Sequence, residues 1–267
     1  MNQGHEELIA KISAAAKEAG KIMLEATDID NKTSEKGSYS NPVTEYDKRV
    51  QAYLFGEMKK ILPEANFLGE EDGNDVFKDE YKKGWLFVID PIDGTNNFVH
   101  GFRPSTTSIG LFLDGKPYIG VIYNPYADEL FTAERGHGAY RNGRKIMSSD
   151  KPLSHSLVSM GTAIYYADSI VNRAFKTAEY YRDKCVDIRR VGVASYDFCL
   201  VAMGVNGLYF EPTLALWDIA AGTVILEEAG GKVTDMDGNE IDFTGYTSIT
   251  AVSRGVLAEG NYFPDFI

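Results

Sequence analysis

The chain begins with an apolar pattern of helical period. Apolar side chains recur every three or four positions, which predicts an amphipathic helix. They are Leu8, Ile12, Ala15, Ala16, Ala19, Ile22 and Met23. The same period returns in residues 45–62, with Val50, Leu54 and Met58 on one side, and a proline follows, so a second helix is expected there. The polar stretch between the two helices, residues 31–41, predicts a mobile loop.

Short apolar segments of strand type follow. A buried strand is predicted at WLFVID, residues 85–90, and further strands at STTSIGLFL, PYIGVIY, ELFTAE and GAYRNGRKI, which together run from residue 105 to residue 146. Asp114-Gly115 and Asn142-Gly143 are tight-turn signals between strands. The first half of the chain therefore predicts an antiparallel meander beside its helices.

After residue 150 the pattern alternates between strands and helices. Strands are predicted at SLVSMGT, VDIRRVG, GLYFE and SITAVS, and helices at residues 167–181, 194–203 and 217–229. Such alternation is typical of α/β folds. The sequence thus predicts a layered α+β or α/β fold with two halves, residues 1–150 and 151–267, packed tightly as one unit.

Composition narrows the function. The chain has 267 residues, is 44% hydrophobic and carries a formal net charge of −12, which predicts a globular protein and argues against a nucleic-acid surface. This charge also repels an anionic substrate unless cations are held at the site. Two cysteines are too few for a disulfide framework. The N-terminal stretch lacks a signal-peptide pattern and no window reaches the length of a membrane span, so a cytoplasmic protein is expected.

The stretch DPIDGTNNF, residues 90–98, follows the buried strand directly. A D-x-x-D pair alone is usually a solvated turn, but strand ends in layered folds are where ligand sites form. Pro91 favours a sharp turn that can aim Asp90 and Asp93 at one point, and such hard oxygen ligands suit Mg²⁺ rather than Zn²⁺. Gly94 allows close backbone approach, and Thr95 can begin a helix whose N–H groups bind phosphate.

Three other acidic positions are ambiguous on their own. Glu70 lies in FLGEEDG, which could equally be an acidic surface loop, and Asp218 lies in LALWDIAAG, where it could simply cap a helix. Asp47 ends NPVTEYD as the second helix begins, and could also be a capping residue.

Together these segments resemble the signatures of the inositol monophosphatase family. GEE at 69–71, DPIDGTNNF at 90–98 and WDIAAG at 217–222 have that family's order and spacing, and NPVTEYD resembles its segment upstream of GEE. The likeness extends over almost the whole chain. It implies the α-β-α-β-α sandwich of the inositol monophosphatase and fructose-1,6-bisphosphatase sugar phosphatases, which agrees with the pattern-based prediction, and it implies a lithium-sensitive, magnesium-dependent phosphatase.

The resemblance also implies roles for individual residues. Two to three Mg²⁺ ions are expected: the first at Glu70, Asp90 and the Ile92 carbonyl, the second at Asp90, Asp93 and Asp218, and a weaker third near Glu70. Thr95 with Asp47 would orient and deprotonate a metal-bound water, with Glu70 as the third catalytic residue. The residues expected to contact substrate are Ile92, Asp93, Gly94, Thr95, Gly192, Val193, Ala194, Glu211 and Asp218. The segment GVAS at 192–195 departs from the family's G-[ST]-A-A, and Tyr165 and Tyr166 lie in a segment that lines the leaving-group side.

The predicted function is Mg²⁺-dependent hydrolysis of inositol 1-phosphate or a related polyol or sugar phosphate. NADP phosphatase, fructose-1,6-bisphosphatase and 3′-phosphoadenosine phosphatase activities are the alternatives within the enzyme class. A bisphosphate substrate would call for a second basic cluster. Arg189 and Arg190 are the candidates, but alternation along a strand puts them on opposite faces. The alternative outside the enzyme class is a metal-binding regulatory protein without turnover. Inhibition by Li⁺ and a homodimer follow from the resemblance, and the partner is expected to be a small phosphate ester, with neither nucleic acid nor membrane.

Overall fold

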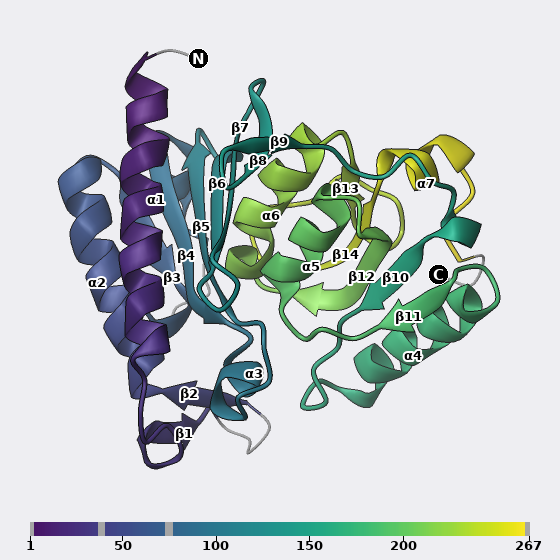
Figure 1. Ribbon diagram of the computed structural model, residues 1–267, viewed down its shortest axis with the longest axis horizontal. Coiled ribbons are helices and arrows are strands. Elements are labelled where there is room, and N and C mark those ends of the chain that lie inside the picture. The colour runs from purple at the N-terminus through teal and green to yellow at the C-terminus, as the bar shows by residue number, and fades with distance from the viewer. Residues whose placement is uncertain (1–2, 37–40, 73–76, 265–267) are drawn as a thin grey trace.

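The computed structural model describes residues 3–36, 41–72 and 77–264, with side chains from residue 6 onward. It contains five layers, helix, sheet, helix, sheet and helix (Figure 1). The outer helices on one side are α1 (Gln3–Leu24) and α2 (Glu45–Ile61). They lie where the apolar periodicity predicts them, and they pack on the first sheet through that apolar face.

The first sheet has seven strands in the order β3-β4-β5-β6-β7-β8-β9. They are β3 (Asn66–Gly69), β4 (Trp85–Asp93), β5 (Thr106–Leu113), β6 (Lys116–Asn124), β7 (Glu129–Glu134), β8 (Gly138–Arg141) and β9 (Arg144–Ile146). All neighbours from β4 to β9 are antiparallel, which confirms the predicted meander. β3 runs parallel to β4 and was missed by the pattern.

The second sheet has five strands in the order β11-β10-β12-β14-β13. They are β10 (Leu157–Met160), β11 (Asp187–Arg189), β12 (Asn206–Leu214), β13 (Lys232–Thr234) and β14 (Thr247–Val252). β10 is parallel to both of its neighbours, whereas β12, β13 and β14 pair antiparallel. α4 (Asp168–Arg182) and α7 (Arg254–Glu259) lie on its outer side (Figure 1).

The loop predicted at residues 31–41 is wrong in its first part. A 3₁₀ turn, Asp30–Lys32, leads into β1 (Thr33–Glu35), which pairs antiparallel with β2 (Pro42–Thr44). Strands of three residues are too short to show a period of two, so the pattern could not reveal them. Residues 37–40, where the same prediction continues, lie outside the described residues.

α5 (Ala194–Ala202) and α6 (Leu216–Glu228) form the middle layer. α6 is apolar on all sides because it contacts the first sheet, α5 and β13. Two glycines let it lie close to the first sheet: a Cβ at Gly110 would be 2.6 Å from the Ala220 Cβ, and one at Gly120 would be 2.4 Å from the Ala221 carbonyl oxygen. This close packing fixes the first turn of α6 beside the end of β4.

The seven-stranded sheet uses residues 66–146 and the five-stranded sheet uses residues 157–252. The predicted boundary at residue 150 falls between them, and the division into two halves stays a prediction. Among the described residues, no helix is both long and apolar enough to cross a membrane.

The close approach of α6 yields a stability prediction. Gly120→Ala should lower the free energy of unfolding by about 1–3 kcal/mol, because the added methyl overlaps a helix backbone carbonyl. Gly56→Ala is the control, since Gly56 is exposed in α2 and its Cβ would have no neighbour within 4 Å. That change should raise stability by up to about 1 kcal/mol through helix propensity. Urea unfolding of both variants checks the pair, and equal stabilities would contradict the packing.

Candidate functional site

A cavity of 370 Å³ opens where the two sheets and the middle helices meet. Its wall joins the end of β4, the short helix α3 (Thr95–Val99), the segments after β10 and before α5, the end of β12 and the start of α6. Most residues expected from the sequence line it, namely Glu70, Asp90, Ile92, Asp93, Gly94, Thr95, Gly192, Ala194, Glu211 and Asp218. Asp47 and Val193 are buried behind this wall, near Thr95 and Gly94 respectively.

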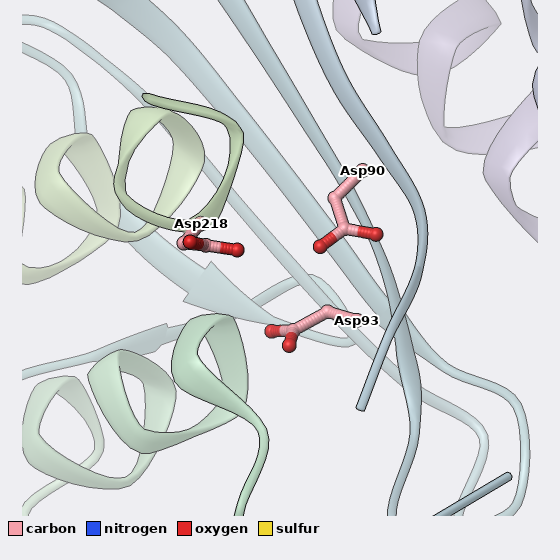
Figure 2. A group of neighbouring side chains, drawn as sticks. All are labelled: Asp90, Asp93 and Asp218. Carbon is pink, nitrogen blue, oxygen red and sulfur yellow. The ribbon is translucent and has the colours of Figure 1, made fainter. Parts of the chain in front are cut away.

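Three carboxylates converge on one side of the cavity. Asp90 and Asp93 come from the end of β4, and Asp218 comes from the first turn of α6. One oxygen from each lies within 4.8 Å of the others, and Figure 2 shows the side chains directed toward a common space. The Asp90 Oδ1 is buried and has no hydrogen-bond partner among the described residues. Asp218 Oδ2 accepts the Ala215 N–H at 2.7 Å, so its helix-capping role holds as well.

Electrostatics at this cluster favours a cation. Burial, together with the negative charge of Glu70 and of the other members of the cluster, raises the pKa of Asp90 well above its ordinary value. Burial and the same kind of repulsion raise the pKa of Asp218 strongly and that of Asp93 to about 6. A divalent cation would relieve this repulsion. The donors are all hard oxygens, which fits Mg²⁺ and not Zn²⁺.

Asp93 also connects the cluster to α5. Its Oδ2 accepts hydrogen bonds from the Ser195 N–H at 2.6 Å and the Ser195 Oγ at 2.5 Å, and its Oδ1 accepts the Ala194 N–H at 3.3 Å. The Ser195 Oγ lies 2.7 Å from the Thr106 Oγ1 of β5. Sequence reasoning missed Ser195, although the departure GVAS marks its position. The contact shows that Asp93 caps α5 as well as facing the cavity.

Glu70 lies at the cavity but outside the three-carboxylate group. The Lys36 Nζ contacts its Oε1 at 3.0 Å and the Glu71 Oε1 at 2.6 Å. Burial alone would lower the pKa of Lys36, but the charges of Glu70 and Glu71 and the hydrogen bonds to them outweigh it and raise that pKa. Sequence reasoning missed Lys36 because it lies in the polar stretch predicted to be a loop. It supplies a fixed cation next to Glu70.

Thr95 and Asp47 meet on another side of the cavity. The Thr95 Oγ1 lies 3.2 Å from the Asp47 Oδ1 and 3.1 Å from the Ile92 carbonyl oxygen. Thr44 begins α2 and donates its N–H and its hydroxyl to the Asp47 Oδ2, at 2.7 Å and 2.5 Å. Burial raises the pKa of Asp47 to about 7 against the effect of these hydrogen bonds. The carboxyl is therefore rigidly held and titrates near neutrality.

Gly94 packs closely against the segment before α5. Its φ of 82° is left-handed, and a Cβ there would lie 2.6 Å from the Val193 Cγ2, so glycine is required for both conformation and space. The Asn97 Nδ2 of α3 donates to the Val191 carbonyl at 3.0 Å. These contacts hold the segment with Gly192 against the loop after β4. The Glu211 carboxylate enters the cavity from β12.

A second cavity of 400 Å³ adjoins the first. The two share Asn41, Glu70, Tyr165, Tyr166 and Asp218 in their walls, and the second adds Lys36, Glu71, Ala215, Trp217 and Tyr246. Charged residues line both cavities, and the second also has the aromatic side chains of Trp217 and Tyr246 in its wall beside the two tyrosines. The ring centroids of Tyr165 and Tyr166 lie 4.8 Å apart with planes at 62°.

Comparison with known proteins agrees with this geometry. The model of the inositol monophosphatase family matches residues 5–262. Inositol monophosphatase 2 of Solanum lycopersicum is 38% identical over 246 residues, which cover 90% of this chain and 91% of that protein. The extragenic suppressor protein suhB of Bartonella henselae has a solved structure with a TM-score of 0.86 and 31% identity, covering 98% of this chain and 100% of that one.

A third similar protein, SaIMPase-II, has been solved with two ligands. The structure with inositol monophosphate has a TM-score of 0.78 and 29% identity, covering 95% of this chain and 93% of that one. The structure with 2′AMP has a TM-score of 0.80 and 29% identity, covering 97% of this chain and 94% of that one. Both likenesses confirm the predicted fold. By sequence, architecture and the acidic cluster, the chain belongs to the inositol monophosphatase family, whose members are metal-dependent phosphatases of small phosphate esters.

Proposed function

We propose that the protein is a Mg²⁺-dependent phosphomonoesterase that hydrolyses inositol 1-phosphate or a related polyol phosphate. The convergence of Asp90, Asp93 and Asp218 in the wall of a 370 Å³ cavity is the observation that carries this proposal. These carboxylates would hold one Mg²⁺. Glu70 with Asp90 and the Ile92 carbonyl would hold a second, and a weaker third would lie near Glu70. When bound, the ions neutralise the phosphate ester and stabilise charge on the attacking and leaving oxygens.

Thr95 and Asp47 would prepare the attacking water. When Asp47 is ionised, the Thr95 hydroxyl donates to its Oδ1, and the 3.2 Å separation allows this bond. As the Thr95 Oγ1 takes a proton from the water, its own hydroxyl proton would pass to the Asp47 carboxylate, and the water lone pair would be directed toward phosphorus. Asp47 is suited to this task because burial raises its pKa, which makes its carboxylate a stronger base.

The leaving group would lie on the other side of the cavity. Glu211 would accept a hydrogen bond from a hydroxyl of the leaving alcohol, and the backbone of Gly192, Val193 and Ala194 would bound it. The N–H groups of Gly94 and Thr95 would hold the phosphoryl oxygens. The contacts of Glu211 and of residues 192–194 would be made to the polyol and not to the transferred phosphoryl, so they bear on substrate choice.

Bisphosphate substrates fit less well. Arg190 lines the cavity and donates to the Thr162 carbonyl at 2.8 Å, whereas Arg189 pairs with Asp187 at 2.5 Å. The two arginines therefore do not form the joint cluster that a second phosphate of a fructose bisphosphate or of 3′-phosphoadenosine 5′-phosphate would need.

A nucleoside 2′-phosphate is the second candidate substrate. NADP carries the same monoester on the ribose of its adenosine. The aromatic rings in the wall of the second cavity favour this candidate, because a base could stack on one of them while the phosphate reaches the carboxylates. SaIMPase-II, which is similar over most of the chain, has been solved with 2′AMP bound. Inhibition by Li⁺ and a homodimer are further proposals that rest on the family, and a cytoplasmic location stays a proposal from the sequence pattern.

Phosphate release from a panel of esters tests the function. With saturating Mg²⁺, kcat/KM should be highest for inositol 1-phosphate, lower for 2′-AMP and lowest for fructose 1,6-bisphosphate. Activity should disappear with a chelator and fall across a Li⁺ titration matched with Na⁺. A ranking headed by 2′-AMP would favour the second candidate. Absence of turnover for every ester would contradict the proposal and support a metal-binding protein without turnover.

The acidic cluster predicts opposite effects for two similar substitutions. Without metal, Asp90→Asn should raise the free energy of unfolding by about 1 kcal/mol, because it removes one carboxyl group from a buried cluster of mutually repelling carboxylates. Asp93→Asn should lower it, since Asp93 caps α5. Both should reduce the stabilisation given by Mg²⁺ and lower kcat by about a thousandfold.

Melting curves with Mg²⁺ and with chelator check this pair, and wild type is the reference. If Asp90→Asn melted lower than wild type in chelator and kept the full Mg²⁺ increment, Asp90 would be a structural residue and the proposed metal site would be wrong.

The site also predicts a pH dependence. Asp47, Asp93 and Glu211 have native pKa values of about 7, 6 and 7, all raised chiefly by burial. The ordinary pKa values are 3.8 for aspartate and 4.5 for glutamate. Between these values and the native ones, the native state holds protons that the unfolded chain has lost. In chelator, their contribution to stability is full below about pH 4 and is lost as the pH rises through 6 to 7, by about 2 kcal/mol or more.

The free energy of unfolding that Mg²⁺ adds should change in the opposite direction. It should grow between about pH 5 and pH 8, because the ion competes with protons for the carboxylates. Urea unfolding over this range with and without Mg²⁺ measures both. Stability that rises with pH in chelator would show that the carboxylates are ionised and paired in some other way.

A further inference from the structure

Gly161 faces Glu211 across two neighbouring strands. It follows β10, and its N–H donates to the Phe210 carbonyl of β12 at 2.9 Å. A Cβ at this position would lie 1.8 Å from the Glu211 Oε2 and 2.4 Å from its Cδ. The φ of Gly161 is not in the left-handed region, so its backbone would accept any residue. The requirement for glycine is therefore spatial: the Glu211 carboxylate occupies the space of the missing side chain.

Tyr209 fixes one oxygen of the same carboxylate. It lies two residues before Glu211, on the same face of β12, and its hydroxyl donates to the Glu211 Oε2 at 2.5 Å. The tyrosine is fully buried, and its ring packs edge-on against Phe198 of α5 at 5.6 Å between centroids. Because the ring cannot swing away, the carboxylate keeps one orientation, and Oε1 is the oxygen left for a substrate hydroxyl.

The surroundings make this support important. Burial raises the pKa of Glu211 to about 7, the Tyr209 hydrogen bond opposes that rise, and Asp93 and Arg190 act on it in opposite directions. Burial keeps the Tyr209 hydroxyl protonated, because it raises its pKa strongly. Tyr209 therefore remains a donor, and a carboxylate without it would be both less ordered and less ionised.

We propose that Gly161 and Tyr209 set the specificity of the cavity for hydroxylated leaving groups by holding the Glu211 carboxylate in place. Gly161 provides the space and Tyr209 provides the orientation, so both act through Glu211 and neither needs to touch the substrate. The inference rests on the proposed leaving-group contact of Glu211. It adds the two positions that make the contact selective.

Steady-state kinetics with two esters tests this inference. Inositol 1-phosphate carries the hydroxyls that Glu211 would accept from, whereas 4-nitrophenyl phosphate has none. Tyr209→Phe should raise KM for inositol 1-phosphate about five- to tenfold with little change in kcat, because one hydrogen bond that orients the acceptor is lost. Gly161→Ala should raise it about tenfold or more. Both variants should hydrolyse 4-nitrophenyl phosphate within about twofold of wild type.

Two further variants separate positioning from general damage. Gly161→Ala should add less than about twofold to the effect of Glu211→Gln on inositol 1-phosphate, because the glycine acts through that carboxylate. Gly207→Ala is the matched control: it lies on β12 outside the cavity wall, and its Cβ would meet the Ser156 Cβ at 2.4 Å. It should lower the melting temperature and leave the ratio of the two KM values unchanged.

Equal losses on both esters for Tyr209→Phe, with Glu211→Gln still selective, would overturn the inference and leave the proposed function standing. If Glu211→Gln reduced the hydrolysis of both esters equally, the proposed contact of Glu211 with the leaving group would be wrong, and so would the inference that rests on it. Should Gly161→Ala not fold, Tyr209→Phe alone decides between these outcomes.

Discussion

Mutual repulsion among buried carboxylates is the constraint on which the site depends. Asp90 and Asp93 approach from the end of β4, and Asp218 approaches from α6. The fold brings them together by packing α6 on the first sheet, and the free energy of that packing must outweigh the repulsion when metal is absent. Burial gives the site its affinity for a cation, because like charges held in a region poor in water are stabilised strongly by an ion of opposite charge.

Absence of a side chain is what permits several of these close approaches. Gly110 and Gly120 let α6 rest on β5 and β6, Gly94 lets the loop after β4 touch Val193, and Gly161 leaves room for Glu211. In each case the next atoms belong to a neighbouring element and not to the glycine's own turn. The positions of the three carboxylates and of Glu211 are therefore set by close contacts that glycines permit between neighbouring elements. Lys36 offsets part of the negative charge at one end of the cavity through Glu70 and Glu71.

Much of the site could be predicted because its residues lie in continuous motifs with distinct local structure. DPIDGTNNF joins a buried strand to a glycine turn, so pattern and chemistry agreed there. Asp218 in WDIAAG could equally have been a helix cap, and only the resemblance to the family assigned it to the site. Lys36, Ser195 and Tyr209 could not be predicted, since each acts on a residue that the fold or a strand face brings near it. Short strands such as β1 and β13 are fixed by their neighbours and carry too few residues for a periodic signal. The placement of Glu70 beside Lys36, outside the three-carboxylate group, likewise depends on tertiary packing.

The central claim is that Asp90, Asp93 and Asp218 share a divalent cation. Anomalous diffraction from crystals grown with Mn²⁺, which prefers the same hard oxygen donors as Mg²⁺, tests it most directly. A strong anomalous peak within coordinating distance of all three carboxylates is predicted, and the peak should vanish in crystals of Asp90→Asn. A map with no peak between these residues, or with peaks only at exposed acidic side chains, would contradict the account.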